Sequence, residues 1–113
     1  MPRLPANYSH NKQLSTTVSD IVPEVTSDAA ELNPAKFHNG NTTTNRVVTV
    51  HIVEVEGDAD AGNILVVKSI PPLKTWTCYE LAGEKILNGM KAQAKQGVGT
   101  DVNVNLSGFD ITS

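Results

Sequence analysis

The side chains that could carry chemistry are few and lie far apart along the chain. Its three histidines are His10, His38 and His51, and its single cysteine is Cys78. No two of them are spaced as metal ligands on one turn or strand usually are, and one cysteine cannot complete a structural zinc site. The sequence therefore predicts surface or partly buried histidines and no bound metal.

Cys78 is also the only thiol that could act as a nucleophile. Nucleophilic catalysis needs a serine or cysteine held by a base and an oriented third group, and the chain contains no Gly-x-Ser-x-Gly elbow. Gly97-Val98-Gly99 supplies two glycines of a dinucleotide fingerprint, but it precedes an expected strand instead of opening a helix. We therefore expect Cys78 to be a small core residue, and we expect neither catalysis nor a cofactor.

The acidic segment Asp58-Ala59-Asp60-Ala61-Gly62-Asn63 is similar to the start of a calcium loop, in which alternate carboxylates converge on the cation. An EF-hand would place glycine at Asn63 and a bidentate glutamate at Ser69, with a helix on each side. The match fails at each of these points. The segment is therefore interpreted as a solvated acidic loop.

The composition is that of a single globular domain. Of the 113 residues, 39% are hydrophobic, which is enough for one modest core. Nine basic and twelve acidic residues give a net charge of -3 without a basic cluster, so nucleic acid is not an expected partner. The longest apolar runs are far shorter than the roughly 20 residues that span a bilayer, so no membrane role is expected either.

The first residues differ in character from the rest. Residues 1–13 contain two prolines and only Leu4 and Tyr8 as sizeable apolar side chains, too few to offset the entropy of ordering. The sequence therefore predicts an extended N-terminal arm over 1–13 and one domain over 14–113. Leu4, Pro5 and Tyr8 would anchor the arm on a neighbouring subunit, and the alternative is a frayed terminus.

The domain itself has the pattern of β-strands. β-Branched residues dominate 46–55, where Val48, Val50 and Ile52 share one face. The connection 39–45 is polar and is expected to be a loop. Further strands are expected over 63–70, 75–79 and 101–111, the last with a bulge at 107–108, and over short edge segments within 14–26.

Two stretches are less clear. Residues 27–31 are expected to form a short helical turn before Asn33-Pro34 ends it. Residues 79–96 contain many helix formers, so a helix is a serious alternative there. Gly83 and Gly89 would each cost roughly 1 kcal/mol inside a helix, and Asn88-Gly89 is a strong hairpin signal. We therefore favour two strands joined by a turn over the helix.

Short strands separated by turn residues, with no sustained helix, predict an all-β fold. The expected architecture is an antiparallel β-sandwich, jelly-roll-like or immunoglobulin-like. Trp76 is the only tryptophan, and it is expected either in the core or as an interface anchor or sugar-stacking platform.

Over residues 37–111 the order of these patterns resembles that of small structural proteins of tailed bacteriophages. The resemblance lies in a turn, a strand, a polar loop, a strand, a Leu-x-Gly and an Asn-Gly turn, closed by a Ser-Gly pair. The matching segments are Phe37-His38-Asn39-Gly40, 46–53, 64–77, Glu80-Leu81-Ala82-Gly83, Ile86-Leu87-Asn88-Gly89, Ala92-Gln93-Ala94 and 102–111.

The resemblance implies a non-enzymatic virion protein, made in the host cytoplasm and needing no cofactor. Its partners would be the major capsid protein, as for a capsid decoration or cement protein, or other virion structural proteins at the neck, tail or baseplate. A homo-oligomer is expected, because a core this small gains stability from assembly. The alternative from another class is a small carbohydrate-binding module that presents Trp76 or Tyr79 beside Asn39 and Asn41.

Overall fold

A computed structural model describes residues 3–112, so residues 1–2 of the expected arm and residue 113 of the expected domain lie outside the described part. Strands dominate it, interrupted only by two short 3-10 helices, η1 and η2. In chain order the elements are β1 (Arg3–Gln13), β2 (Ser19–Val22), β3 (Ala29–Leu32), β4 (Ala35–Asn39), β5 (Arg46–Val53), η1 (Ala61–Asn63), β6 (Ile64–Ile70), β7 (Thr75–Cys78), η2 (Tyr79–Leu81), β8 (Lys85–Leu87), β9 (Lys91–Gln96) and β10 (Val102–Ile111).

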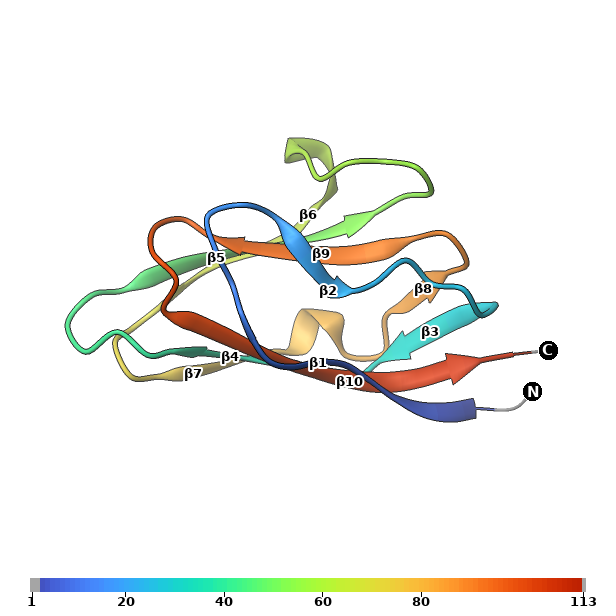
Figure 1. Cartoon of the computed structure of the whole chain (residues 1–113), viewed down its shortest axis with the longest axis horizontal. Coiled ribbons are helices and arrows are strands. Elements are labelled where there is room, and N and C mark those ends of the chain that lie inside the picture. The colour runs from blue at the N-terminus through green and yellow to red at the C-terminus, as the bar shows by residue number, and fades with distance from the viewer. Residues whose placement is uncertain (1–2, 113) are drawn as a thin grey trace.

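The strands form two antiparallel sheets that face each other (Figure 1). The first sheet has the order β7, β4, β10, β3, β8, and β1 pairs with the other side of β10. The second sheet has the order β2, β9, β5, β6. The predicted all-β, antiparallel, sandwich-like fold is therefore confirmed.

β10 is the central strand of the first sheet. Its residues 102–105 pair with β4 and its residues 108–111 pair with β3, so β3 and β4 lie end to end along one side of it. Pro34, between them, has no backbone N–H to donate. Asn33 keeps this stretch attached, because its N–H donates to the Ser107 carbonyl at 3.0 Å.

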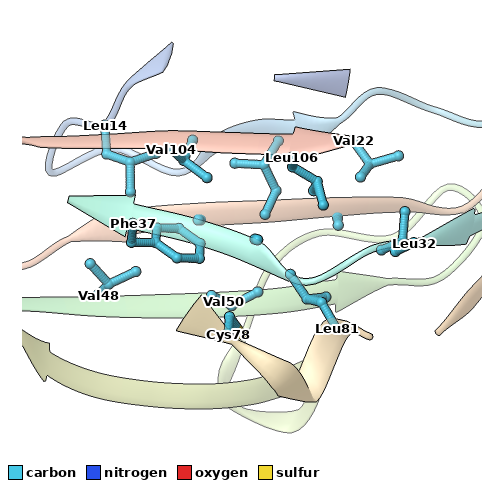
Figure 2. Close-up of a cluster of buried hydrophobic side chains, with 14 of the residues drawn as sticks. Leu14, Val22, Leu32, Phe37, Val48, Val50, Cys78, Leu81, Val104 and Leu106 are labelled. Carbon is cyan, nitrogen blue, oxygen red and sulfur yellow. The ribbon is translucent and has the colours of Figure 1, made fainter. Parts of the chain in front are cut away.

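The core fills the space between the two sheets (Figure 2). Alternate residues of the facing strands supply it, such as Val48 and Val50 of β5 and Val104 and Leu106 of β10, all at most 2% exposed. Phe37 of β4, also fully buried, is the largest side chain among them. The alternation predicted for the β5 and β10 segments is therefore confirmed.

The segment expected to be an arm is a strand of the sandwich. Arg3–Gln13 forms β1, which pairs with β10 from Arg3↔Ile111 to Gln13↔Asn103. Composition did not indicate this, because main-chain pairing along β10, and not burial of many apolar side chains, holds the segment. The Arg3 side chain adds an ion pair with Glu31 and lies over the Phe109 ring at 4.6 Å.

The helical turn predicted for 27–31 is wrong, because β3 occupies Ala29–Leu32. The helix propensity of the two alanines is small, and it is overridden by pairing with β10 on one side and β8 on the other. Ala30 and Leu32 are buried there, which a single exposed helical turn would not achieve.

Residues 79–96 form strands, as favoured, but the turn between them is not a hairpin turn. β8 pairs with β3 in the first sheet, whereas β9 pairs with β5 and β2 in the second. Asn88-Gly89 therefore carries the chain from one sheet to the other. Gly89 has φ 85° whereas Asn88 does not have positive φ, so the type I′ geometry that joins hairpin strands is not adopted.

The apolar phase of β10 changes near its end, as expected. Buried positions are even-numbered up to Gly108, and Ile111 is buried after it. The ladder irregularities lie in the partner strand, because the register of β1 shifts between Asn7 and Ser9 and again between Ser9 and Lys12. The bulge is therefore in β1 and not at the predicted place in β10.

Candidate interaction surface

β6 is one of the two edge strands of the second sheet, and among residues 3–112 no strand pairs with its outer side. Its inner side pairs with β5 from Arg46↔Ile70 to His51↔Ile64. Of its seven residues only Ile70 is buried. The outward N–H and C=O groups of β6 therefore present a template on which another strand can pair.

The other sheet edges are shielded, irregular or short. β1 has two register shifts and a residue with left-handed backbone, Asn11 at φ 46°. These irregularities hinder the pairing of another strand along that part of its edge. β2 lies against β1, where the Ser9 hydroxyl donates to the Ile21 carbonyl at 2.7 Å. β7 has four residues and β8 has three. β6, regular from Val66 to Ile70, is thus one free edge of the described chain, and the start of β1, regular from Arg3 to Asn7, is another.

Exposed aliphatic side chains lie on the outer face beside this edge. Val67 is 53% exposed, Ile64 41%, and Val47 on the neighbouring strand β5 is 42% exposed. Val67 pairs with Thr49, so it projects away from the core that the adjacent Val48 enters. Clustered exposed aliphatic side chains of this kind mark interaction sites more often than scattered ones do.

Charge is divided between the two ends of β6. Before the strand, the connection 54–63 contains no basic residue and four acidic ones, Glu54, Glu56, Asp58 and Asp60. Towards and beyond its other end lie Lys68 and, in the following turn, Lys74. Among the described residues, none of these six side chains makes an ion pair. The edge therefore has a negative end and a positive end.

The three residues predicted to anchor an arm have different roles. Leu4 is 58% exposed and Pro5 is also exposed, so both remain available to a partner. Tyr8 packs against the core, and its hydroxyl donates to Asp110 Oδ1 at 2.8 Å. Burial, with the hydrogen bond to Asp110 second, raises the pKa of Tyr8 well above its usual value. Tyr8 therefore stabilises its own domain.

Trp76 is a partly buried residue of β7. It stacks on Phe37 with ring centroids 5.2 Å apart and planes at 25°. The amides expected beside a Trp76 sugar platform are occupied within the fold, because Asn39 donates to the Ile70 carbonyl at 2.9 Å and Asn41 accepts two N–H groups of its own loop. Trp76 therefore packs at the edge of the core, and the hydrogen bonds of Asn39 and Asn41 within the fold leave neither amide free to bind a sugar beside it.

The side chains that could carry chemistry are dispersed in the structure, as they are in the sequence. Cys78 is buried, and burial raises the pKa of its thiol to about 11, so the reactive thiolate is disfavoured. His38 contacts the Thr75 hydroxyl through Nδ1 at 2.9 Å, and His10 is exposed. Within residues 3–112 no three His, Cys, Asp or Glu side chains gather as metal ligands would.

The acidic loop has a local structural explanation. Asp60 caps η1, because its Oδ1 accepts the Gly62 N–H at 2.8 Å, while Asn63 Oδ1 accepts the Asp60 N–H at 3.0 Å. This reciprocal pair is a capping box. The resemblance of this segment to a calcium loop therefore reflects the residues that a tight turn needs.

Comparison with protein-family models, with curated proteins and with solved structures finds no match for the chain. In the part that the structure describes, no helix has the length and apolar character needed to cross a membrane. The inference of function therefore proceeds from the surface itself.

Sequence reasoning identified β6 as a strand but not as the free edge. The run Ile64-Leu65-Val66-Val67 signals a strand through its β-branched residues. Whether such a strand is central or at an edge depends on where the rest of the chain pairs. The one available signal was the exposed, mixed character of Lys68-Ser69, which is more typical of an edge than of a central strand.

Proposed function

We propose that this protein is a non-enzymatic structural subunit of a tailed-phage virion, acting as a decoration protein on the major capsid protein, and that its copies associate through β6. The observation that carries the proposal is the free apolar edge of β6 with its divided charge. The sandwich fold and the resemblance over residues 37–111 support the virion as the setting.

The occupant that best fits the β6 edge is the β6 edge of a second copy. In an antiparallel pair about a two-fold axis, the acidic connection 54–63 of each copy lies beside Lys68 and Lys74 of the other. Parallel pairing would place like charges together. The main-chain bonds would supply affinity, and Val67 and Ile64 of both copies would extend one apolar face.

Association through one strand edge is expected to be weak in solution. Such an interface is smaller than the roughly 1,200 Å² that stable complexes bury. On a symmetric shell the same contact acts many times, and multivalency raises its effective strength. This combination suits a protein that binds a particle cooperatively and stays monomeric when dilute.

Sedimentation equilibrium over a concentration series tests the edge contact. We expect a reversible monomer–dimer equilibrium for the natural chain, weakened at least about tenfold by Val67→Lys, because like charges then face each other across the two-fold axis. Leu87→Lys is the matched control, since Leu87 is 56% exposed on β8 in the other sheet. A monomer at every concentration, or equal dimerisation of the two variants, would contradict the contact.

Immunogold electron microscopy of phage particles from the source lysate tests the setting. Antibody raised against the purified protein should label the outer shell of the head. Label confined to the neck, tail or baseplate would replace decoration by a tail role, and absence of label from all particles would overturn the virion proposal while leaving the β6 contact to be judged by sedimentation.

A further inference from the structure

The chain contains two Asn-Gly dipeptides, Asn39-Gly40 and Asn88-Gly89. Asparagine followed by glycine is the dipeptide most prone to spontaneous deamidation, because glycine has no side chain to keep its backbone nitrogen away from the asparagine amide carbon. For the reaction to start, the glycine N–H must leave its hydrogen bond and the asparagine side chain must rotate towards it. The hydrogen bonds around each dipeptide therefore decide which of the two reacts in the folded protein.

The surroundings of Asn39 hold both reacting groups in place. Its side chain is fully buried, and its Nδ2 donates to the Ile70 carbonyl at 2.9 Å. Its Oδ1 accepts the Asn41 N–H at 2.9 Å, and the Gly40 N–H donates to the Asp101 carbonyl at 2.9 Å. Ring closure at Asn39 therefore requires several hydrogen bonds, some of them buried, to break together.

The surroundings of Asn88 are more open. Asn88 is exposed, and within residues 3–112 its side chain makes one hydrogen bond, from Nδ2 to the Ser27 carbonyl at 2.9 Å. The Gly89 N–H donates to the Val25 carbonyl at 2.9 Å. Release of these two bonds frees both reacting groups. Hydrogen bonds at an exposed turn open at a lower free energy than those of a buried core.

We propose that Asn88 is a site of spontaneous deamidation in the folded protein and that Asn39 is protected from the same reaction. The Gly89 nitrogen attacks Asn88 Cγ, and the side-chain amide nitrogen leaves as ammonia, which carries away the Gly89 proton. A five-membered succinimide ring remains. Water then opens the ring at one of its two carbonyls, giving aspartate or isoaspartate. Either product makes the net charge of -3 more negative by one unit.

The modified turn belongs to a link between two segments that cross from one sheet to the other (Figure 1). Residues 25–28 lie between β2 and β3, and residues 88–90 lie between β8 and β9. The Val25 N–H donates to the Met90 carbonyl at 2.9 Å, and the Gly89 N–H donates back to the Val25 carbonyl. The two crossing segments therefore lie side by side and hold each other.

Deamidation weakens this link in either product. Aspartate faces the Ser27 carbonyl with a carboxylate oxygen where Asn88 has an N–H donor. Isoaspartate adds one carbon to the main chain between the N–H of residue 88, which donates to the Asp28 carbonyl at 3.1 Å, and the Gly89 N–H. The two main-chain bonds then lose their common geometry. We therefore expect the modified protein to be less stable than the natural one.

Peptide mapping by mass spectrometry tests the proposal on the full chain, kept at mildly alkaline pH in the folded state and, in parallel, in concentrated urea. In the folded chain Asn88 should convert at least about tenfold faster than Asn39, because fewer and more exposed hydrogen bonds must open. In urea the two sites should convert at similar rates. Anion exchange of the folded protein should separate one acidic product, whose unfolding midpoint in urea is lowered.

Asn88→Gln is the matched variant, because it keeps an amide but would have to close a six-membered ring, which forms far more slowly. The folded variant should give no acidic product over the same period. The proposal is overturned if Asn39 converts as fast as Asn88 in the folded chain, if Asn88 stays unmodified there while the urea-treated chain converts, or if Asn88→Gln yields as much acidic product. An unchanged unfolding midpoint of the acidic product would overturn the effect on the link.

Discussion

At the scale of single residues, Gly108 shows how closely two strands approach. A Cβ at this position would collide with the backbone carbonyl oxygen of Glu31 in β3 and would lie 3.0 Å from Tyr8 Cε2. The carbonyl cannot yield without breaking the β3–β10 ladder. The need for glycine here comes from space and not from a left-handed backbone, because Gly108 is not among the residues with positive φ.

We therefore expect Gly108→Ala to lower the free energy of unfolding in urea by at least about 1–3 kcal/mol. Gly97→Ala is the control, because its Cβ would lie 3.9 Å from the nearest atom, the Val47 carbonyl oxygen. That variant should be neutral or slightly stabilising. Equal stability of the two variants would contradict the packing described for β10 and β3.

The ion pair of Arg46 and Asp101 gives the fold an acid-sensitive contact. The Arg46 guanidinium donates to Asp101 Oδ2 at 2.7 Å, and this bond, with a smaller contribution from Asn41, holds the pKa of that carboxyl below its usual value. A lowered folded-state pKa means that the pair stabilises the fold above the unfolded-state pKa near 3.8 and stops doing so as the pH falls through the lowered value.

Urea denaturation from about pH 6 to about pH 2 measures this dependence. We expect Asp101→Asn to be less stable than the natural chain at the upper pH and to lose less stability on acidification. Asp58→Asn, which alters an exposed carboxylate outside the ion pairs of the described chain, should keep the acid slope of the natural chain. An unchanged acid slope in Asp101→Asn would count against the pair.

At the scale of elements, the strands with period-two alternation were predictable and the pairing of β1 was not. The β5 and β10 strands can be predicted because the alternation of apolar and polar residues is a local property of the sequence. β1 has few apolar residues, so its stability depends on main-chain bonds to a strand nearly the whole chain length away. Such bonds leave no mark in side-chain composition.

Substitution of Tyr8 distinguishes a strand from an arm. Because the Tyr8 hydroxyl bonds to Asp110 within one chain, Tyr8→Phe should lower the free energy of unfolding by about 1–2 kcal/mol, independently of protein concentration. Tyr79→Phe is the control, since Tyr79 is 71% exposed and its hydroxyl makes no hydrogen bond in the described chain. If Tyr8→Phe had no effect on the dilute monomer, β1 would have to be reassigned as a free arm.

The Asn88-Gly89 turn shows where a correct local signal gives an incorrect topology. The Met90 N–H donates to the Leu87 carbonyl at 2.9 Å, so a tight turn is present as expected. Its geometry splays the flanking strands, and contacts of Asn88 and Gly89 with Asp28 and Val25 send β8 and β9 to different sheets. The turn residues specify a reversal of the chain direction. The strands available for pairing then decide which sheet β8 and β9 each join.

For the candidate sites, the sequence indicates the residue types but not which side chains lie near one another in space. His51 was expected as an ordinary histidine, and the structure leaves it 4% exposed with Nδ1 2.8 Å from Asn63 Oδ1 of the connection that follows β5. Leu4 and Pro5 were anticipated as surface anchors and are exposed. The apolar face around Val67 depends on an edge position that no local pattern encodes.

At the scale of the whole molecule, the two sides of the sandwich differ in how the chain passes between the sheets. Where β1 passes across to β2, the chain covers the boundary between the sheets, whereas β6 ends the second sheet without a cover. Figure 1 shows the start of β1 beside the end of β10 at one end of the molecule, where Arg3 pairs with Ile111. The free β6 edge, flanked by exposed aliphatic side chains, is the feature from which we infer assembly.

Backbone amide hydrogen exchange across a concentration series tests this inference most directly. The outward amides of Ile64–Ile70 should exchange quickly in the dilute protein and become protected as concentration rises, while those of β7 and β8 stay unchanged. Exchange of β6 that is independent of concentration, or protection that develops at β7 or β8 instead, would contradict assembly through the β6 edge.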